Sequence, residues 1–284
     1  MGNRQEKLIL PTQAGPIGVF DSGYGGLTIL NEIRKQLPEY DYIYLGDNAR
    51  TPYGTRSFDV VYQYTLECVT RLFSMGCHLV ILACNTASAK ALRTIQQQDL
   101  PLLDSGRRVL GVIRPTVEVL ENYSSTKHVG ILATEGTVQS ESYPIEIKKI
   151  NPSIVVFSEA CPMWVPLIEN NEHLQSGADY FVRKNLEAIL SKDKNIDTIV
   201  LGCTHYPLLI PKIKQYLPEG IKLVSQGEIV ATSLHDYLKR HPEIEIKCTK
   251  KKEIKYYTTE SADKFKSSAS VFLQAEIDVE KISI

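Results

Sequence analysis

The stretch that decides the fold is residues 80–88, VILACNTAS, and its pattern returns at residues 199–207, IVLGCTHYP. Each stretch begins with a short apolar run rich in β-branched residues, which is typical of a buried strand in a parallel sheet. A cysteine follows, Cys84 in the first stretch and Cys203 in the second, and then come residues that can cap or begin a helix. Each stretch is therefore predicted to be a strand-to-helix junction with a thiol at its turn.

The position of the two thiols predicts their chemistry. Where a strand ends and a helix begins, free backbone N–H groups and the helix dipole favour negative charge. We therefore expect the pKa of each thiol to lie below its ordinary value of about 8.5. Cys84 and Cys203 are 119 positions apart, so each can belong to its own α/β unit, and we expect them to face each other across one small-molecule site.

Strand and helix patterns alternate along the chain, which favours the α/β class. Gly18 and Gly130 lie in similar predicted strands 112 positions apart, close to the spacing of the two cysteines. The two spacings suggest two similar α/β halves with a cleft between them. Near the end of the chain, residues 243–248 and 253–257 alternate apolar and polar side chains and are predicted to form a half-exposed hairpin.

Length and composition narrow the class of protein. A chain of 284 residues is expected to form two domains of ordinary size. Its formal net charge of −1 provides no overall field for nucleic acid or an anionic membrane, so neither is an expected partner. The sequence shows no secretory signal and no apolar stretch long enough to cross a membrane, so a cytoplasmic protein is expected.

The cysteines and glycines indicate neither a disulfide framework nor a bound cofactor. The six cysteines are expected to be reduced, and none has the spacing of a zinc ligand. The glycine-rich turn at residues 22–26 lacks the third small residue of a dinucleotide fingerprint and the lysine of a P-loop. A pyridoxal enzyme is also not indicated, because no lysine follows a predicted strand beside phosphate-binding glycines. We expect no metal and no cofactor.

Two cysteines in matching positions suit a symmetric proton transfer. A thiolate on one side of a carbon can remove its hydrogen, while a thiol on the other side delivers one. Asp21 ends a predicted strand and is either a turn-capping residue or a carboxylate of the site. His205 lies two positions from Cys203 and can orient or tune that thiol. Helix amino ends and polar side chains would stabilise the carbanion.

At these residues the chain resembles the glutamate racemases, cofactor-independent members of the aspartate/glutamate racemase superfamily. The resemblance runs from about residue 17 to residue 273. It rests on several motifs in order: GVFDSG at 18–23, PYG at 52–54, ACNTAS at 83–88, GTVQS at 136–140, VPLIE at 165–169 and LGCTHYP at 201–207.

The resemblance implies two similar doubly wound parallel-sheet domains related by pseudo-twofold symmetry, with glutamate bound in the cleft between them. The first domain would span residues 15–110 plus 224–284, and the second residues 111–223. The protein would be a cytoplasmic homodimer that supplies D-glutamate for peptidoglycan.

The resemblance also assigns roles to residues. Cys84 would act on D-glutamate and Cys203 on L-glutamate, with Asp21 assisting Cys84, and His205 and Glu169 assisting Cys203. The implied substrate contacts are Asp21, Ser22, Tyr53, Gly54, Asn85, Thr86, Thr204 and His205.

Three other functions stay open at this point. A racemase acting on aspartate or another amino acid would also use two thiols. A lyase or decarboxylase on the same fold would need only one of them. A binding protein without catalysis would use the cysteines merely to fill space.

Overall fold

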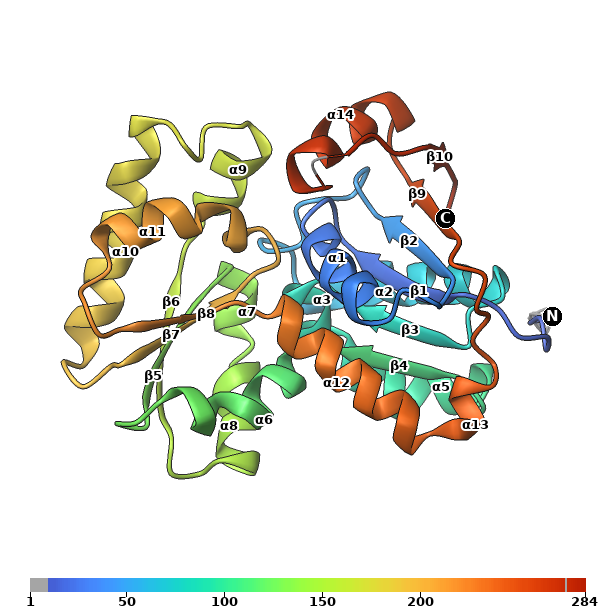
Figure 1. Cartoon of the computed structure of the whole chain (residues 1–284), viewed down its shortest axis with the longest axis horizontal. Coiled ribbons are helices and arrows are strands. Elements are labelled where there is room, and N and C mark those ends of the chain that lie inside the picture. The colour runs from blue at the N-terminus through green and yellow to red at the C-terminus, as the bar shows by residue number, and fades with distance from the viewer. Residues whose placement is uncertain (1–9, 274) are drawn as a thin grey trace, which may run out of the picture.

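The computed structural model describes residues 10–273 and 275–284 and contains two parallel β-sheets (Figure 1). The first sheet has the strand order β10-β9-β2-β1-β3-β4 and the second the order β6-β5-β7-β8. The first sheet consists of β1 (Ile17–Asp21), β2 (Tyr42–Gly46), β3 (Leu79–Leu82), β4 (Arg108–Gly111), β9 (Ile254–Thr258) and β10 (Val279–Lys281). The second consists of β5 (His128–Ala133), β6 (Val155–Ala160), β7 (Thr198–Gly202) and β8 (Lys222–Val224). The predicted α/β class with parallel sheets is confirmed.

The two sheets share one topology. Within the first sheet, β2-β1-β3-β4 lie side by side, and β6-β5-β7-β8 repeat this order, so β5 corresponds to β1 and β7 to β3. This correspondence pairs Gly18 with Gly130, and it places Cys84 and Cys203 after equivalent strands. The similar spacings in the sequence therefore reflect a repeated arrangement of strands.

Helices cover both faces of each sheet, as in doubly wound folds. The first sheet packs against α1 (Gly26–Gln36), α12 (Gly227–Arg240) and α14 (Ala262–Leu273) on one face and against α2 (Phe58–Ser74) and α3 (Asn85–Lys90) on the other. The second packs against α9 (Trp164–Glu169), α10 (Ser176–Lys192) and α11 (Ile210–Tyr216) on one face and against α6 (Ile113–Tyr123) and α8 (Ser142–Ile150) on the other. The remaining helical segments are α4 (Leu92–Thr94), η1 (Ile95–Asp99), α5 (Leu100–Leu103), α7 (Glu135–Gln139), η2 (Tyr206–Leu209) and α13 (Pro242–Glu245).

The longest helix before Cys84, α2, shows how local sequence sets the elements. Ser57 caps it, with its hydroxyl accepting the N–H of Val60 at 3.4 Å. The buried side chains of α2 recur every three or four positions and so form one face. Gly76 follows the helix with a φ of 95°, a backbone conformation that glycine adopts without strain. The chain then enters β3, which leads to Cys84.

The chain passes between the sheets twice, and these crossings delimit the halves. The first crossing joins β4 to α6 through Val112, and the second joins β8 to α12 through residues 225 and 226. We propose residues 15–110 plus 224–284 and residues 111–223 as the two domains, with boundaries one or two residues before these crossings. Figure 1 shows them side by side, with α12 running beneath the first sheet.

The predicted hairpin near the end of the chain is wrong. Residues 242–245 form helix α13, and β9 pairs in parallel with β2 instead of with residues 243–248. The reason is that alternation signals only a half-exposed face, whereas the pairing partner is decided by the free edge of β2. Among the helices of the described residues, none combines the length and apolar character needed to span a membrane.

Candidate active site

Both thiols lie just beyond strand carboxyl ends, at equivalent positions of the two sheets. Cys84 is the N-cap of α3, and its sulfur accepts the N–H of Ala87 at 3.5 Å. The capping group is therefore the cysteine itself and not Asn85 or Thr86. Cys203 directly follows β7. Each cysteine is 6% exposed, so both thiols are largely withdrawn from solvent.

Two residues at the end of β1 accompany Cys84. The Ser22 hydroxyl lies 3.5 Å from the Cys84 sulfur. Asp21 is fully buried, and its carboxylate accepts the backbone N–H of Gly23 at 2.9 Å. The glycine-rich turn that follows β1 therefore holds the carboxylate next to the first thiol.

A histidine and a glutamate accompany Cys203. The Nδ1 atom of His205 lies 3.9 Å from the Cys203 sulfur, and its Nε2 atom lies 3.0 Å from a carboxylate oxygen of Glu169. The edge of the His205 ring meets Phe272 of α14, with 5.5 Å between ring centroids. The three groups predicted for this side are thus joined in one chain of contacts under an aromatic cover.

The two sides meet through Thr204 and a glycine. The Thr204 hydroxyl donates to Asp21 at 3.4 Å, which links the second sheet to the first. A β-carbon on Gly25 would lie 2.3 Å from the Thr204 hydroxyl and 2.4 Å from Nδ1 of His205. Only glycine allows the turn after β1 to approach this closely, so the glycine-rich turn serves contact between the two domains.

The pKa of Cys84 departs from the expectation. The net pKa is raised to about 12: burial and, after it, the charge of Asp21 raise it, while the hydrogen bonds from Ser22 and from the Ala87 N–H partly offset this rise. The charge of Cys203 also acts to raise it, which shows that the two sulfurs interact. The predicted lowering is therefore wrong for Cys84, because the effect of the short helix α3 is outweighed by the loss of water around the thiol.

The pKa of His205 shifts in the opposite direction from a simply buried histidine. Burial by itself lowers it, but the hydrogen bonds with Cys203 and Glu169 raise it to about 10. At neutral pH the ring is therefore an imidazolium that donates from both nitrogens. Its Nδ1–H stabilises negative charge on the Cys203 sulfur.

Replacing Glu169 by glutamine is expected to lower the pKa of His205 by about 1 to 2, because the amide carries no charge to pair with the imidazolium. NMR titration of labelled histidine side chains measures this shift directly. Glu172→Gln, three positions further along the chain and exposed, provides the matched control. An unchanged His205 titration in Glu169→Gln would show that Glu169 does not hold the proton on the ring.

Asn85 and Thr86 face the second domain from the first turn of α3. The Thr86 hydroxyl lies 2.9 Å from the hydroxyl of Thr134 and 3.4 Å from that of Thr137. The Asn85 amide donates to Gln226 at 2.7 Å and accepts from Tyr143 at 2.9 Å. Both residues, which directly follow Cys84 in the chain, therefore make hydrogen bonds at the junction of the domains.

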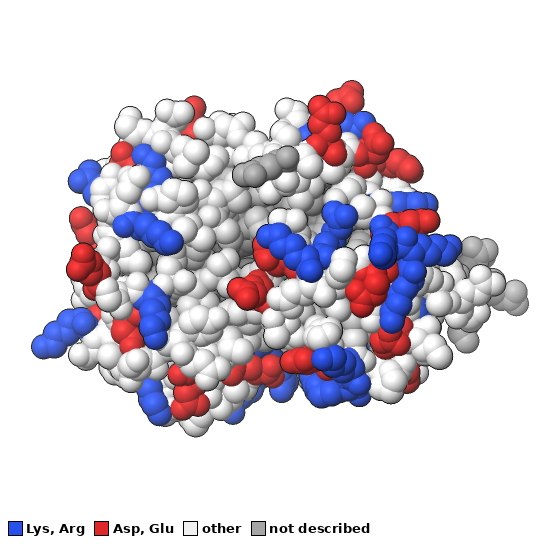
Figure 2. Space-filling view, in the orientation of Figure 1, with Lys and Arg blue, Asp and Glu red and all other residues white. Residues whose placement is uncertain are grey.

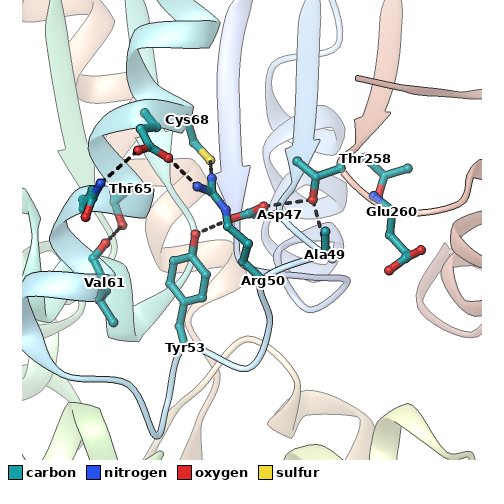
Figure 3. A network of polar contacts seen from close by, with 12 residues as sticks. Asp47, Ala49, Arg50, Tyr53, Val61, Thr65, Cys68, Thr258 and Glu260 are labelled. Carbon is teal, nitrogen blue, oxygen red and sulfur yellow. Dashed lines mark hydrogen bonds and ion pairs between the residues drawn. The ribbon is translucent and has the colours of Figure 1, made fainter. Parts of the chain in front are cut away.

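Tyr53 and Gly54 lie at this junction in a different way. Figure 3 shows the Tyr53 hydroxyl directed at Asp47, which also accepts from Nε of Arg50 at 2.7 Å. The side chain thus anchors its own loop on the first domain. The carbonyl of Gly54 accepts the N–H of Gly136 at 2.8 Å, across the junction. Because the Tyr53 hydroxyl is already bonded to Asp47, we expect this loop to contact a ligand through its backbone atoms.

The central residues of the site are buried: Cys84 and Cys203 are each 6% exposed, and Asp21 is not exposed at all. A cavity of about 670 Å³ opens elsewhere, between α3, α6, α8 and α12, and no predicted site residue lines it. Within the described part of the chain, no group of three or more histidine, cysteine or acidic side chains is arranged to hold a metal ion. On the face in Figure 2, acidic and basic side chains are interspersed over both halves. Because both thiols and Asp21 are withdrawn from solvent, we expect a ligand to enter by separation of the two domains.

Several polar residues at the junction or beside it were not predicted. They are Asp47, Thr134, Thr137, Tyr143 and Gln226. Asp47, Thr134 and Gln226 each follow the end of a parallel strand, the same signal that singled out Asp21. Tyr143 has no such signal, because it lies within the helix α8.

Comparison with known proteins gives one consistent result. Residues 22–234 match the family model described as Asp/Glu/Hydantoin racemase. The chain is 38% identical over 274 residues to glutamate racemase of Ruegeria sp. (strain TM1040), covering 93% of this chain and 98% of that protein.

Solved structures agree. The crystal structure of a glutamate racemase isoform from Bacillus anthracis superimposes with a TM-score of 0.86 at 33% identity, covering 95% of this chain and 98% of that one. Glutamate racemase from Francisella tularensis in complex with D-glutamate superimposes with a TM-score of 0.82 at 34% identity, with the same coverage.

Proposed function

The chain belongs to the Asp/Glu/hydantoin racemase family, and on that basis we infer that it is a glutamate racemase, an isomerase that interconverts L-glutamate and D-glutamate. Its similarity to glutamate racemases extends over almost the whole of both chains and so includes both sheets.

We propose that the reaction uses the two thiols in turn. With D-glutamate bound, the Cys84 thiolate removes the α-proton and the Cys203 thiol delivers its own proton to the opposite face of the carbanion. The products are L-glutamate, a neutral Cys84 and a Cys203 thiolate, so protons and charge balance. The reverse reaction starts from that thiolate.

The observation that carries this proposal is how close the surroundings of the two thiols lie. Ser22 contacts the Cys84 sulfur, and Asp21, the residue before Ser22, accepts a hydrogen bond from Thr204, the residue after Cys203. The imidazolium of His205 favours charge on the Cys203 sulfur. The Asp21 carboxylate opposes charge on the Cys84 sulfur and so favours the protonated form there. The surroundings of the two thiols therefore differ: a histidine ring faces Cys203, and a carboxylate lies beside Cys84.

Proton exchange in heavy water tests the function. Incubating the protein with L-glutamate in ²H₂O should yield D-glutamate that carries deuterium at the α-carbon, because the delivered proton comes from a thiol that equilibrates with solvent. Mass spectrometry after chiral separation measures the label. L-Aspartate, assayed alongside, should react at least about 10²-fold more slowly, since a site that binds both carboxylates of glutamate leaves polar groups unpaired with a shorter chain. Folded protein that neither labels nor inverts glutamate would rule out the assignment.

We further propose that the enzyme works in the cytoplasm as a homodimer and supplies D-glutamate for peptidoglycan. The resemblance to glutamate racemases supports these three points. Light scattering after size-exclusion chromatography tests the dimer: the expected mass is twice 31.9 kDa.

A further inference from the structure

Three buried side chains close a ring of hydrogen bonds next to the active site. The Asn85 amide donates to the side-chain carbonyl of Gln226 at 2.7 Å. The Gln226 amide nitrogen lies 2.9 Å from the Tyr143 hydroxyl, and that hydroxyl donates to the Asn85 carbonyl at 2.9 Å. Asn85 is 2% exposed, Tyr143 1% and Gln226 2%, so the ring is screened from water.

The ring lies where the chain crosses between the domains. Gln226 belongs to the second crossing, and its amide nitrogen lies 3.2 Å from the carbonyl of Val112, the residue of the first crossing. The same nitrogen lies 2.9 Å from the hydroxyl of Thr116 in α6. Gln226 thus holds the two crossing segments together, while Tyr143 comes from the second domain and Asn85 from the first.

The ring fixes which way the Asn85 amide points. If the amide were turned over, its carbonyl would face the carbonyl of Gln226, leaving two buried acceptors without a donor between them. In the observed orientation the Asn85 nitrogen uses one of its two hydrogens for Gln226. Within residues 10–273 and 275–284, the Asn85 nitrogen donates to Gln226 and to no other acceptor. The second hydrogen of the Asn85 amide can therefore bond to a ligand.

We propose that Gln226 and Tyr143 are positioning residues that aim the second N–H of Asn85 at a carboxylate of the bound amino acid. Because the ring spans both crossings, the aim is correct only when the domains are closed. Substrate affinity is thereby coupled to domain closure. This proposal rests on the proposed function, since it requires glutamate to bind at the junction.

Tyr143→Phe tests the proposal with the removal of one oxygen. The ring then lacks its donor to Asn85, and we expect KM for both glutamate enantiomers to rise about tenfold, with kcat within about threefold of wild type. Tyr42→Phe is the matched control: the Tyr42 hydroxyl is also buried and donates to the carbonyl of Leu37 at 2.7 Å, far from the crossings. Its KM should equal that of wild type.

Gln226→Glu provides a second, independent variant. An ionised carboxylate still accepts from Asn85 but cannot donate to Tyr143, so the hydroxyl turns its hydrogen toward the new charge and leaves Asn85. A similar rise in KM is expected. The double variant Tyr143→Phe/Gln226→Glu should be no worse than the more severe single one, because both changes break the same ring.

The measurements distinguish a failure of the positioning proposal from a failure of the proposed racemase function. A merely structural role would lower the melting temperature and the amount of active enzyme, and so kcat, without moving KM. Equal KM values in Tyr143→Phe, Tyr42→Phe and wild type would overturn the proposal while leaving the racemase function intact. If Tyr143→Phe does not fold, Gln226→Glu decides by the same criterion. Wild-type protein that does not racemise glutamate would instead overturn the proposed function.

Discussion

Replacing either Cys84 or Cys203 by serine is expected to lower kcat for racemisation by about 10³-fold, within the usual range for loss of a general acid or base. A serine hydroxyl is a far weaker acid than a thiol, so it neither supplies the base nor readily gives up its proton. The two enantiomers have equal free energies, which fixes the equilibrium constant at 1. A change in either cysteine must therefore lower kcat/KM equally in both directions.

Circular dichroism of glutamate, followed from each enantiomer, measures these rates. Cys248→Ser is the matched control, because Cys248 is also 6% exposed and its sulfur already contacts the carbonyl of Ile244 at 3.4 Å. The control should keep wild-type kcat. Near-normal racemisation by Cys84→Ser or by Cys203→Ser would contradict the two-thiol mechanism, and loss of activity in only one of them would favour single-thiol chemistry.

Asp21→Asn is expected to lower kcat by about 10²-fold and at the same time to stabilise the fold. The pKa of Asp21 is raised by burial, which outweighs the opposing charge of His205 and the N–H of Gly23. An amide has nearly the same shape and can keep contacts with Gly23 and Thr204, but it removes the charge that favours the protonated form of Cys84. Activity should fall because, without the Asp21 charge, the surroundings of Cys84 no longer favour its protonated form, and the two thiols lose their distinct roles as acid and base.

The stabilisation should depend on pH in a defined direction. Native Asp21 keeps its proton to higher pH than an aspartate in the unfolded chain, so the native state binds more protons above the ordinary carboxyl pKa of about 4. Stability is therefore lost as the pH rises through that window, and Asn at this position avoids the loss. We expect the melting temperature to rise by roughly 2–4 °C at pH 8, equivalent to about 1 kcal/mol, and to match wild type near pH 4. A lower melting temperature at pH 8 would mean that the Asp21 charge stabilises the native state.

In this site the buried charge that catalysis requires lowers the stability of the fold. Asp21 is fully buried beside a thiol whose charged form is also disfavoured by burial. Such an arrangement is tolerated because it separates the roles of the two thiols. The closed domains strengthen every charge interaction in the site, and they must open to admit the substrate.

The sequence by itself determined most of the strands, the α/β class and the two strand-to-helix junctions. These features depend on side chains that are neighbours in the chain: apolar runs around β3 and β7, a cap at Ser57 and a glycine after α2. It also singled out Asp21 and His205, because a polar residue after a buried strand is a local pattern. The resemblance to a family added Glu169, which has no local signal of its own.

The tertiary structure alone decided the pKa of Cys84, the strand that β9 pairs with, and the hydrogen-bond partners of Asn85. The pKa of Cys84 follows from burial by distant segments, and this outweighs the local effect of the helix end that the sequence predicted. The partner of β9 was decided by the free edge of β2, and the orientation of Asn85 by Tyr143 and Gln226. Desolvation, strand pairing and hydrogen-bond closure all depend on groups far apart in the chain, so no local pattern contains them.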